Sequence, residues 1–131
     1  MDNFPESFSD LLKNECKAFA YLATTMPDGS PQVTPVWFDM EGEYIRFNSA
    51  VGRVKDKNIR NNPHVALAIA DPDDPYRYLQ IRGKVVEITQ DGADEHIHAL
   101  SQKYHGRNYD IPAGQERVMY KVQPESFFIK E

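Results

Sequence analysis

The segment AFAYLATTMPDGSPQVTPVWFD, residues 18–39, decides the fold class of this chain. Two stretches with many aromatic and β-branched residues flank the turn sequence Pro27-Asp28-Gly29, so the segment predicts a β-hairpin. Pro35 lies inside the second stretch, and a proline cannot donate a hydrogen bond to a neighbouring strand. The second strand should therefore lie at a sheet edge or contain a bulge.

The remaining pattern extends this hairpin into a mainly β fold. Short apolar runs separated by turns predict further strands, at residues 43–49, 64–71, 76–88 (with a bend at Gly83), 117–122 and 126–130. Apolar spacings of three and four predict helices, at residues 5–17 and 92–104. About six antiparallel strands with two or three helices favour a small β-barrel with helical additions. We find no repeat and no long linker, which predicts a single domain over residues 1–131.

The composition argues against several classes of protein. The chain of 131 residues has a net charge of −5, and extended binding to nucleic acid needs many cations, so no nucleic-acid partner is expected. The longest apolar run, residues 65–70, is too short to span a bilayer, and the acidic start MDNFPESFSD is unlike a signal peptide. Cys16 is the only cysteine, which excludes an internal disulfide and fits a reducing compartment. We expect a cytoplasmic protein without a membrane partner.

Residues 53–60 gather positive charge in an otherwise acidic chain. Arg53, Lys55, Lys57 and Arg60 accompany a single anion, Asp56, so this octet has a local charge of +3. If the octet is helical, the free N–H groups of its first turn and the positive end of its dipole favour an anion such as phosphate. A solvated basic face is the alternative. Ideal helical phase would place Arg53, Lys57 and Arg60 on one stripe, with Lys55 elsewhere.

The stretch TPVWF, residues 34–38, is a second candidate feature. Around Pro35, the backbone groups of Val33, Thr34 and Val36 would be free to bond something other than a strand. A planar heterocycle with donors and acceptors along one edge is such a partner. An edge strand that uses its proline to avoid aggregation is the alternative, and the sequence leaves both interpretations open.

No metal site is predicted, and no residue is assigned a catalytic role. His96 and His98 lie two residues apart in a predicted helix and would point to opposite sides, whereas a helical zinc pair uses a spacing of four. The serines lack the context of a nucleophile elbow. The glycines form neither a Walker nor a dinucleotide-binding motif.

Three successive stretches together resemble a known family: LATTMPDGSPQVTPVWFD (22–39), GEYIRFNSAVGRVKDKNIRNNPHVALAI (42–69) and DPDDPYRYLQIRGKVVEI (71–88). They are similar to the pyridoxamine 5′-phosphate oxidase-like (PPOX class) FMN-binding split-barrel superfamily, most closely to its short proteins that use the deazaflavin coenzyme F420. The resemblance covers approximately residues 18–90. It implies a six-stranded antiparallel split β-barrel that forms a homodimer, with the cofactor in a groove at the subunit interface.

The resemblance also implies which residues lie beside the cofactor ring. Five consecutive residues would line the flavin or deazaflavin ring, largely through backbone groups: Gln32, Val33, Thr34, Pro35 and Val36. Asn48 and Ser49 would lie beside the ring and the ribityl chain.

A further part of the resemblance concerns the cofactor phosphate. Arg53 and Lys55 match the family's phosphate-binding cations, which favours this pair over the helical stripe. Lys57 and Asn58 would be their neighbours. Tyr76 and Tyr78 match positions that reach across from the second subunit, and of the two Tyr78 is assigned to the cofactor site.

The function implied by the resemblance is redox chemistry carried by the cofactor. The chain ends without the segment whose arginine and histidine hold the substrate phosphate in true pyridoxamine 5′-phosphate oxidases, so vitamin B6 oxidation is not expected. The leading hypothesis is an oxidoreductase in which reduced F420 gives a hydride to a small unsaturated or quinone-like acceptor. The alternatives are an FMN-dependent flavin reductase or oxidase of the same fold, and a non-catalytic carrier of flavin or haem.

Overall fold

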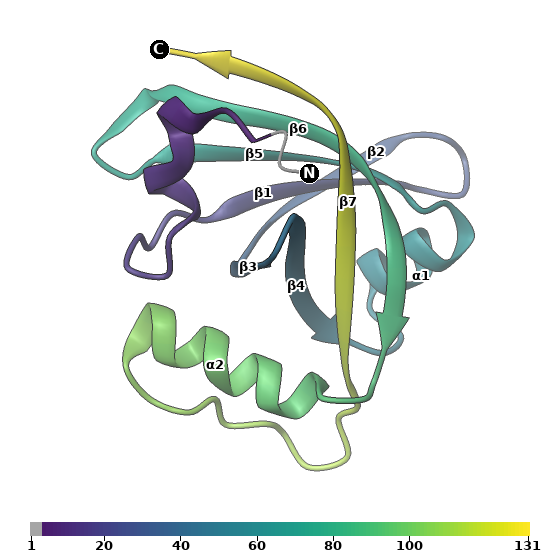
Figure 1. Ribbon diagram of the computed structural model, residues 1–131. Coiled ribbons are helices and arrows are strands. Elements are labelled where there is room, and N and C mark those ends of the chain that lie inside the picture. The colour runs from purple at the N-terminus through teal and green to yellow at the C-terminus, as the bar shows by residue number, and fades with distance from the viewer. Residues whose placement is uncertain (1–3) are drawn as a thin grey trace.

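Seven antiparallel strands form one curled sheet in the computed structural model, which describes residues 4–131 (Figure 1). The strands are β1 (Ala20–Thr25), β2 (Pro31–Val36), β3 (Phe38–Glu41), β4 (Tyr44–Ala50), β5 (His64–Asp71), β6 (Asp74–Thr89) and β7 (Arg117–Lys130). The helices are a 3-10 helix, η1 (Glu6–Leu12), and two α-helices, α1 (Val54–Asn61) and α2 (Ala93–His105). The prediction of a mainly β, antiparallel fold with helical additions is confirmed.

The strand order is β2-β1-β5-β6-β7-β4-β3, which places β2 and β3 at the two edges of the sheet. Pro35 of β2 lies opposite Tyr21 of β1. On its other side β2 has no neighbouring strand among residues 4–131, so the missing N–H of Pro35 costs the sheet little. The predicted edge position of Pro35 is confirmed.

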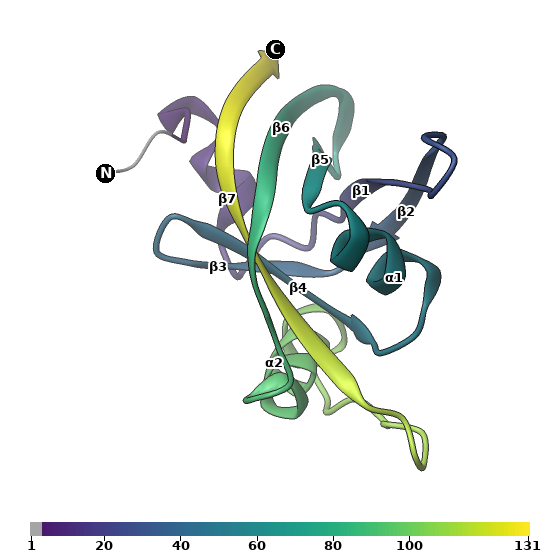
Figure 2. The ribbon, with the colours of Figure 1, turned by 90° about the vertical axis from the view of Figure 1, so that its right-hand side faces the viewer.

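The two longest strands, β6 and β7, bend together where the sheet curls, as Figure 2 shows. Their pairing shifts register between Arg82 and Gly83. A Cβ atom at Gly83 would lie 2.5 Å from the carbonyl oxygen of Gln123, so this close approach requires a glycine. Pro124, which has no N–H to donate, lies opposite Gly83 at the irregularity. The predicted interruption at Gly83 is therefore confirmed.

Some element boundaries differ from the predicted ones. The strand predicted at 31–39 is two strands, because β2 pairs with β1 at one edge of the sheet and β3 pairs with β4 at the other. The chain changes partners at Trp37. The two short strands predicted near the C-terminal end are one, β7. The described chain has seven strands, where about six were predicted. The helix predicted at residues 5–17 is the shorter η1, and residues 1–3 of the predicted domain lie outside the described residues.

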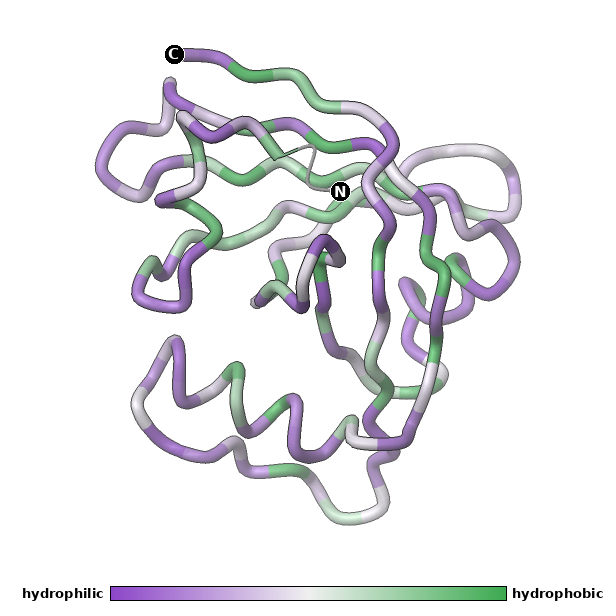
Figure 3. Tube along the Cα trace, in the orientation of Figure 1, coloured by the Kyte–Doolittle hydropathy of each residue, from purple (hydrophilic) through white to green (hydrophobic). Residues whose placement is uncertain are grey.

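The apolar core lies inside the curl of the sheet. Buried and exposed positions alternate along β6 from Leu79 to Val86, and Figure 3 shows alternating green and purple segments on this strand. α2 packs against β4 and β7. At its C-terminal end the Tyr104 hydroxyl donates to the Ala18 carbonyl at 2.6 Å, and the Lys103 ammonium donates to the Phe38 carbonyl at 2.8 Å. None of the helices in the described chain has the length and apolar character needed to cross a membrane.

Candidate functional site

A pocket of about 200 Å³ lies between β2, β4, the start of α1, α2 and the start of β7. Its lining residues come from segments far apart in the sequence: Pro35, Val36, Trp37, Asn48, Ser49, Arg53, Lys55, Ile97, Leu100, Tyr109 and Arg117. The structure thus brings the proline-containing edge strand and the basic octet to one place. Half of the predicted cofactor-binding residues line this pocket: Pro35, Val36, Asn48, Ser49, Arg53 and Lys55.

Three cations line the pocket, and the described part of the chain gives them no acidic partner. Within residues 4–131, none of Arg53, Lys55 and Arg117 forms an ion pair. Burial lowers the pKa of Lys55, and the nearby charges of Arg53 and Arg117 lower it further. Arg117 is only 5% exposed, and burial lowers its pKa as well. Cations that are crowded and partly buried favour an anionic ligand, which would offset their repulsion with charge-assisted hydrogen bonds.

A buried hydroxyl of the pocket wall also lacks a partner. Ser49 lines the pocket and is 2% exposed, and its Oγ has no hydrogen-bond partner among the described residues. The same holds for Oγ1 of Thr34, one residue before Pro35 in β2. A buried polar group without a partner costs about 1–3 kcal/mol. A polar ligand in the pocket would supply the partner that Ser49 lacks.

Asp56 holds the first turn of α1 beside the pocket. Its buried carboxylate accepts hydrogen bonds from the Gly52 N–H at 3.0 Å, from Nε of Arg60 at 3.0 Å and from the Tyr120 hydroxyl. Burial opposes ionisation, but these donors prevail and lower the pKa of Asp56 below its ordinary value. Arg60 is bonded to Asp56 and is not among the residues that line the pocket. The helical stripe of Arg53, Lys57 and Arg60 therefore does not line the pocket as a set.

The other half of the predicted binding residues does not line the pocket within one chain: Gln32, Val33, Thr34, Lys57, Asn58 and Tyr78. Asn58 is buried and donates to Oγ1 of Thr24 at 3.0 Å, and that hydroxyl in turn donates to Oε1 of Gln32 at 3.0 Å. These bonds fasten α1 to the β1–β2 hairpin, which is a structural task. Lys57 is exposed, and Tyr78 lies on β6. Their proposed contacts with a cofactor stay predictions.

Trp37 belongs to the stretch TPVWF that the sequence singled out, but four other lining residues were not predicted: Ile97, Leu100, Tyr109 and Arg117. The rings of Trp37 and Tyr109 lie edge to face at 6.3 Å, and the Arg117 guanidinium lies over the Tyr109 ring at 5.1 Å. Arg117 opens β7 opposite Ala50, one step from the pairing of Ser49. In the sequence, Arg117 is only an arginine at the start of a predicted strand. It can be assigned to the pocket only when β7 is known to pair with β4.

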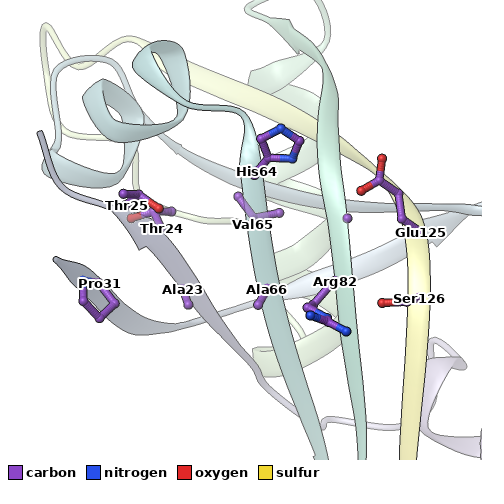
Figure 4. A pocket seen from close by; sticks show the side chains of 11 residues that line it. Ala23, Thr24, Thr25, Pro31, His64, Val65, Ala66, Arg82, Glu125 and Ser126 are labelled. Carbon is purple, nitrogen blue, oxygen red and sulfur yellow. The ribbon is translucent and has the colours of Figure 1, made fainter. Parts of the chain in front are cut away.

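A second hollow, of about 390 Å³, lies on the face of the sheet that points away from the core (Figure 4). Ala23, Ala66, Arg82 and Ser126 lie opposite one another across β1, β5, β6 and β7, so their side chains share this face. Two alanines and Gly83 have little or no side chain, so the middle of this face is a depression in the protein surface. Val33, which is 64% exposed, lies opposite Ala23 and borders the same face.

The curled antiparallel sheet and its cation-lined pocket place the protein in the class of flavin-type split-barrel proteins. Residues 5–130 match the family model for pyridoxamine 5′-phosphate oxidase, and the chain belongs to this family. The resemblance expected from the sequence is confirmed.

Solved structures of other proteins share this fold. An F420 reductase superimposes with a TM-score of 0.84 and 38% sequence identity, over 95% of this chain and 98% of that chain. A conserved hypothetical protein of Mycobacterium tuberculosis gives a TM-score of 0.74 at 21% identity, over 98% and 85% of the two chains. General Stress Protein 26 of Bacillus anthracis gives 0.69 at 18% identity, over 95% and 92%. These last two show the fold alone, and no curated protein gives a significant match.

Replacing Asp56 by asparagine should destabilise the protein by about 3 kcal/mol at neutral pH, because a buried carboxylate that accepts from Gly52, Arg60 and the buried Tyr120 hydroxyl is lost. The folded-state pKa of Asp56 lies below the ordinary value of 3.8. The extra stability of the wild-type protein over Asp56→Asn is therefore fully present when the pH is above the ordinary pKa of an aspartate. It is lost as the pH falls through the lower, folded-state pKa. Urea unfolding at about pH 7 and about pH 3 measures the change.

The exposed Asp110 provides the control, since Asp110→Asn removes the same charge without removing a buried acceptor. Its effect on stability should stay within about 0.5 kcal/mol at both pH values. An Asp56→Asn deficit that is equal at both pH values would contradict the assigned role of the carboxylate.

Proposed function

We propose that the protein is an oxidoreductase that binds coenzyme F420 and promotes hydride transfer to a small unsaturated or quinone-like acceptor. The observation that carries this proposal is the convergence of Arg53, Lys55 and Arg117, without acidic partners among residues 4–131, beside the proline-containing edge strand. A ligand with a phosphate and further anionic groups would balance that charge. The 38% identity to a protein named F420 reductase supports this cofactor over FMN.

The residues present fit such a cofactor at its anionic end. The three cations and the first turn of α1 would hold phosphate, and the unpaired Ser49 hydroxyl would gain a partner. Trp37, Ile97 and Leu100 supply the apolar wall that excludes water. When bound, the deazaflavin supplies the hydride chemistry, and the protein supplies its position and the surrounding field.

The pocket of one chain is too small for the whole cofactor. Its volume of about 200 Å³ lies below the roughly 300–1,000 Å³ of most ligand pockets. The exposed Pro35 belongs both to this pocket and to the outer sheet face, where it lies opposite Tyr21. A molecule that covers the outer face would therefore also close the pocket at Pro35.

We propose that a second copy of this chain covers the outer face and forms a homodimer. The face carries apolar side chains that one chain leaves in solvent: Tyr21, 46% exposed, Val33, 64% exposed, and Phe128, 54% exposed. Tyr21 lies opposite Ala68, which lies opposite Gln80, which lies opposite Phe128, so Tyr21 and Phe128 are on one face. An apolar sheet face with a central hollow suits a closely packed partner of the same kind.

The cofactor is tested by titrating the purified protein with F420 and, separately, with FMN while the fluorescence of Trp37 is followed. Trp37 lines the pocket and is the only tryptophan of the chain, so a bound ring or phosphate should change its emission. We expect saturable binding with a clear preference for F420. A preference for FMN would instead favour a function as an FMN-dependent flavin reductase or oxidase. Bound cofactor that no acceptor reoxidises would indicate a carrier, and no saturable change with either would end the proposal.

The position of the phosphate is tested with two lysines of the same helix. Lys55→Ala should weaken cofactor binding tenfold or more, since about 1.4 kcal/mol of charge-assisted bonding is lost. Lys57→Ala removes the same charge from an exposed position and should change the dissociation constant by less than about threefold. Both are measured by the Trp37 titration at one ionic strength. Equal effects of the two substitutions would show that only the general charge of α1 matters.

The dimer is tested by placing a charge on the outer face. Light scattering should find the wild-type protein dimeric, and Val33→Glu should make it monomeric and weaken cofactor binding, because a buried unpaired carboxylate is costly. Val86→Glu is the control, since Val86 is 52% exposed and lies in β6 beyond Gly83, away from β1 and β2. A wild-type protein that is monomeric with and without cofactor would contradict the proposed dimer.

A further inference from the structure

A continuous chain of hydrogen bonds runs from Asp39 to Arg117 through the wall of the pocket. Nε2 of His96 lies 3.1 Å from Oδ1 of Asp39, and its other ring nitrogen, Nδ1, lies 3.2 Å from Nδ2 of Asn48. Nε of Arg117 donates to Oδ1 of Asn48 at 2.9 Å. Asp39, His96, Asn48 and Arg117, which we call the Asp39–Arg117 relay, come from four different elements, β3, α2, β4 and β7.

The direction of every bond in the relay follows from groups that can act in only one way. The Ala93 carbonyl can only accept, and it lies 3.0 Å from Nδ2 of Asn48, while Nε of Arg117 can only donate. Nδ2 of Asn48 is therefore the amide NH₂, and its second hydrogen points to His96. Nδ1 of His96 must then accept, so the ring proton sits on Nε2 and is donated to Asp39.

The far end of the relay is fixed by a carboxylate with strong partners. Arg46 donates to Oδ1 and Oδ2 of Asp39 at 2.9 and 2.8 Å. Burial raises the pKa of Asp39, but the hydrogen bonds from His96 and Arg46 outweigh it, so the net shift is downward. Asp39 is thus an anion that accepts from Nε2 of His96, and His96 is 4% exposed, so water does not compete for its ring.

We propose that His96 is a positioning residue for the anion site: its unprotonated Nδ1 orients the Asn48 amide, and that amide holds Arg117 toward the ligand. This inference rests on the proposed function in one respect, that the anion is the cofactor's phosphate end. Inorganic pyrophosphate, a compact phosphate anion, therefore serves as a probe of the anion site that does not depend on the cofactor. The resemblance to known proteins implied a cofactor contact for Asn48 but no role for Asp39, His96 or Arg117.

The position of Arg117 depends on Asn48 because Arg117 has few other strong partners. Besides Asn48 it donates to Oε1 of Gln115 at 2.9 Å and lies over the Tyr109 ring, and it forms no ion pair within residues 4–131. A half-turn of the Asn48 amide would bring NH₂ against the Arg117 guanidinium, two donors facing each other. The Ala93 carbonyl and Nδ1 of His96 together prevent that rotation.

Two substitutions at position 96 separate positioning from simple packing. The side-chain oxygen of His96→Asn lies close to the place of Nδ1 and can still accept from Asn48. The longer side chain of His96→Gln reaches the place of Nε2, so it can bond Asp39 but leaves the second hydrogen of the Asn48 amide without an acceptor. The affinity for inorganic pyrophosphate and for F420, followed by Trp37 fluorescence, should stay within about threefold for His96→Asn and fall at least tenfold for His96→Gln.

Each outcome of this comparison decides the question. If His96→Asn and His96→Gln bind like wild type, the relay does not position Arg117. If both lose affinity equally, His96 acts only through packing. Arg77→Gln provides the control for general loosening, since it removes the ion pairs with Asp10 and Asp71 and touches no member of the relay. It should lower stability and leave the affinity for pyrophosphate unchanged.

A spectroscopic measurement on the unaltered protein covers the case in which a variant fails to fold. Nitrogen NMR of the His96 ring should show the proton on Nε2 and an unprotonated Nδ1 at neutral pH. A proton on Nδ1 would overturn the proposal. The same titrations distinguish failure of this inference from failure of the proposed function. If pyrophosphate binds in a way that depends on His96 but F420 does not bind, the role of His96 is retained and the proposed cofactor is rejected.

Discussion

The buried carboxylate of Asp56 is the contact on which the candidate site depends. It joins the Gly52 N–H, Arg60 and the Tyr120 hydroxyl, and so connects the loop before α1, the helix itself and β7. A buried charge is tolerated only where several donors surround it, and here those donors come from the elements that carry the pocket. The first turn of α1 is therefore held in place by the same group that neutralises one of its arginines.

The pocket is stabilised by its surroundings but is not itself neutral. Arg53, Lys55 and Arg117 remain without acidic partners in the described chain, and the Ser49 hydroxyl remains unpaired. Such groups lower the stability of the free protein, and functional sites are where proteins commonly keep them. A split-barrel protein of this family thus keeps, in one small pocket, polar groups that a purely structural core would have paired.

Local patterns in the sequence predicted most of the fold and half of the pocket, while long-range pairing decided the rest. The edge position of Pro35 and the interruption at Gly83 follow from the chemistry of single residues, so they could be predicted. The break at Trp37 could not, since it depends on which strands pair at the two sheet edges. Arg117 was missed because its place beside Asn48 exists only once β7 pairs with β4. The bond from Asn58 to Thr24 could not be predicted either, because buried helix anchors and ligand contacts use the same amide chemistry.

The contrast between an acidic chain and one cationic pocket has a kinetic consequence. At a net charge of −5, most of the surface repels a polyanion, whereas the patch formed by Arg53, Lys55 and Arg117 attracts it. Such a field guides an anionic molecule toward one entrance and with its charged end foremost, so orientation is set during the encounter. The guidance acts over about 8 Å at physiological ionic strength and fades as salt is added. Encounter rate, and not only final affinity, would then distinguish anionic cofactors from neutral molecules of similar shape.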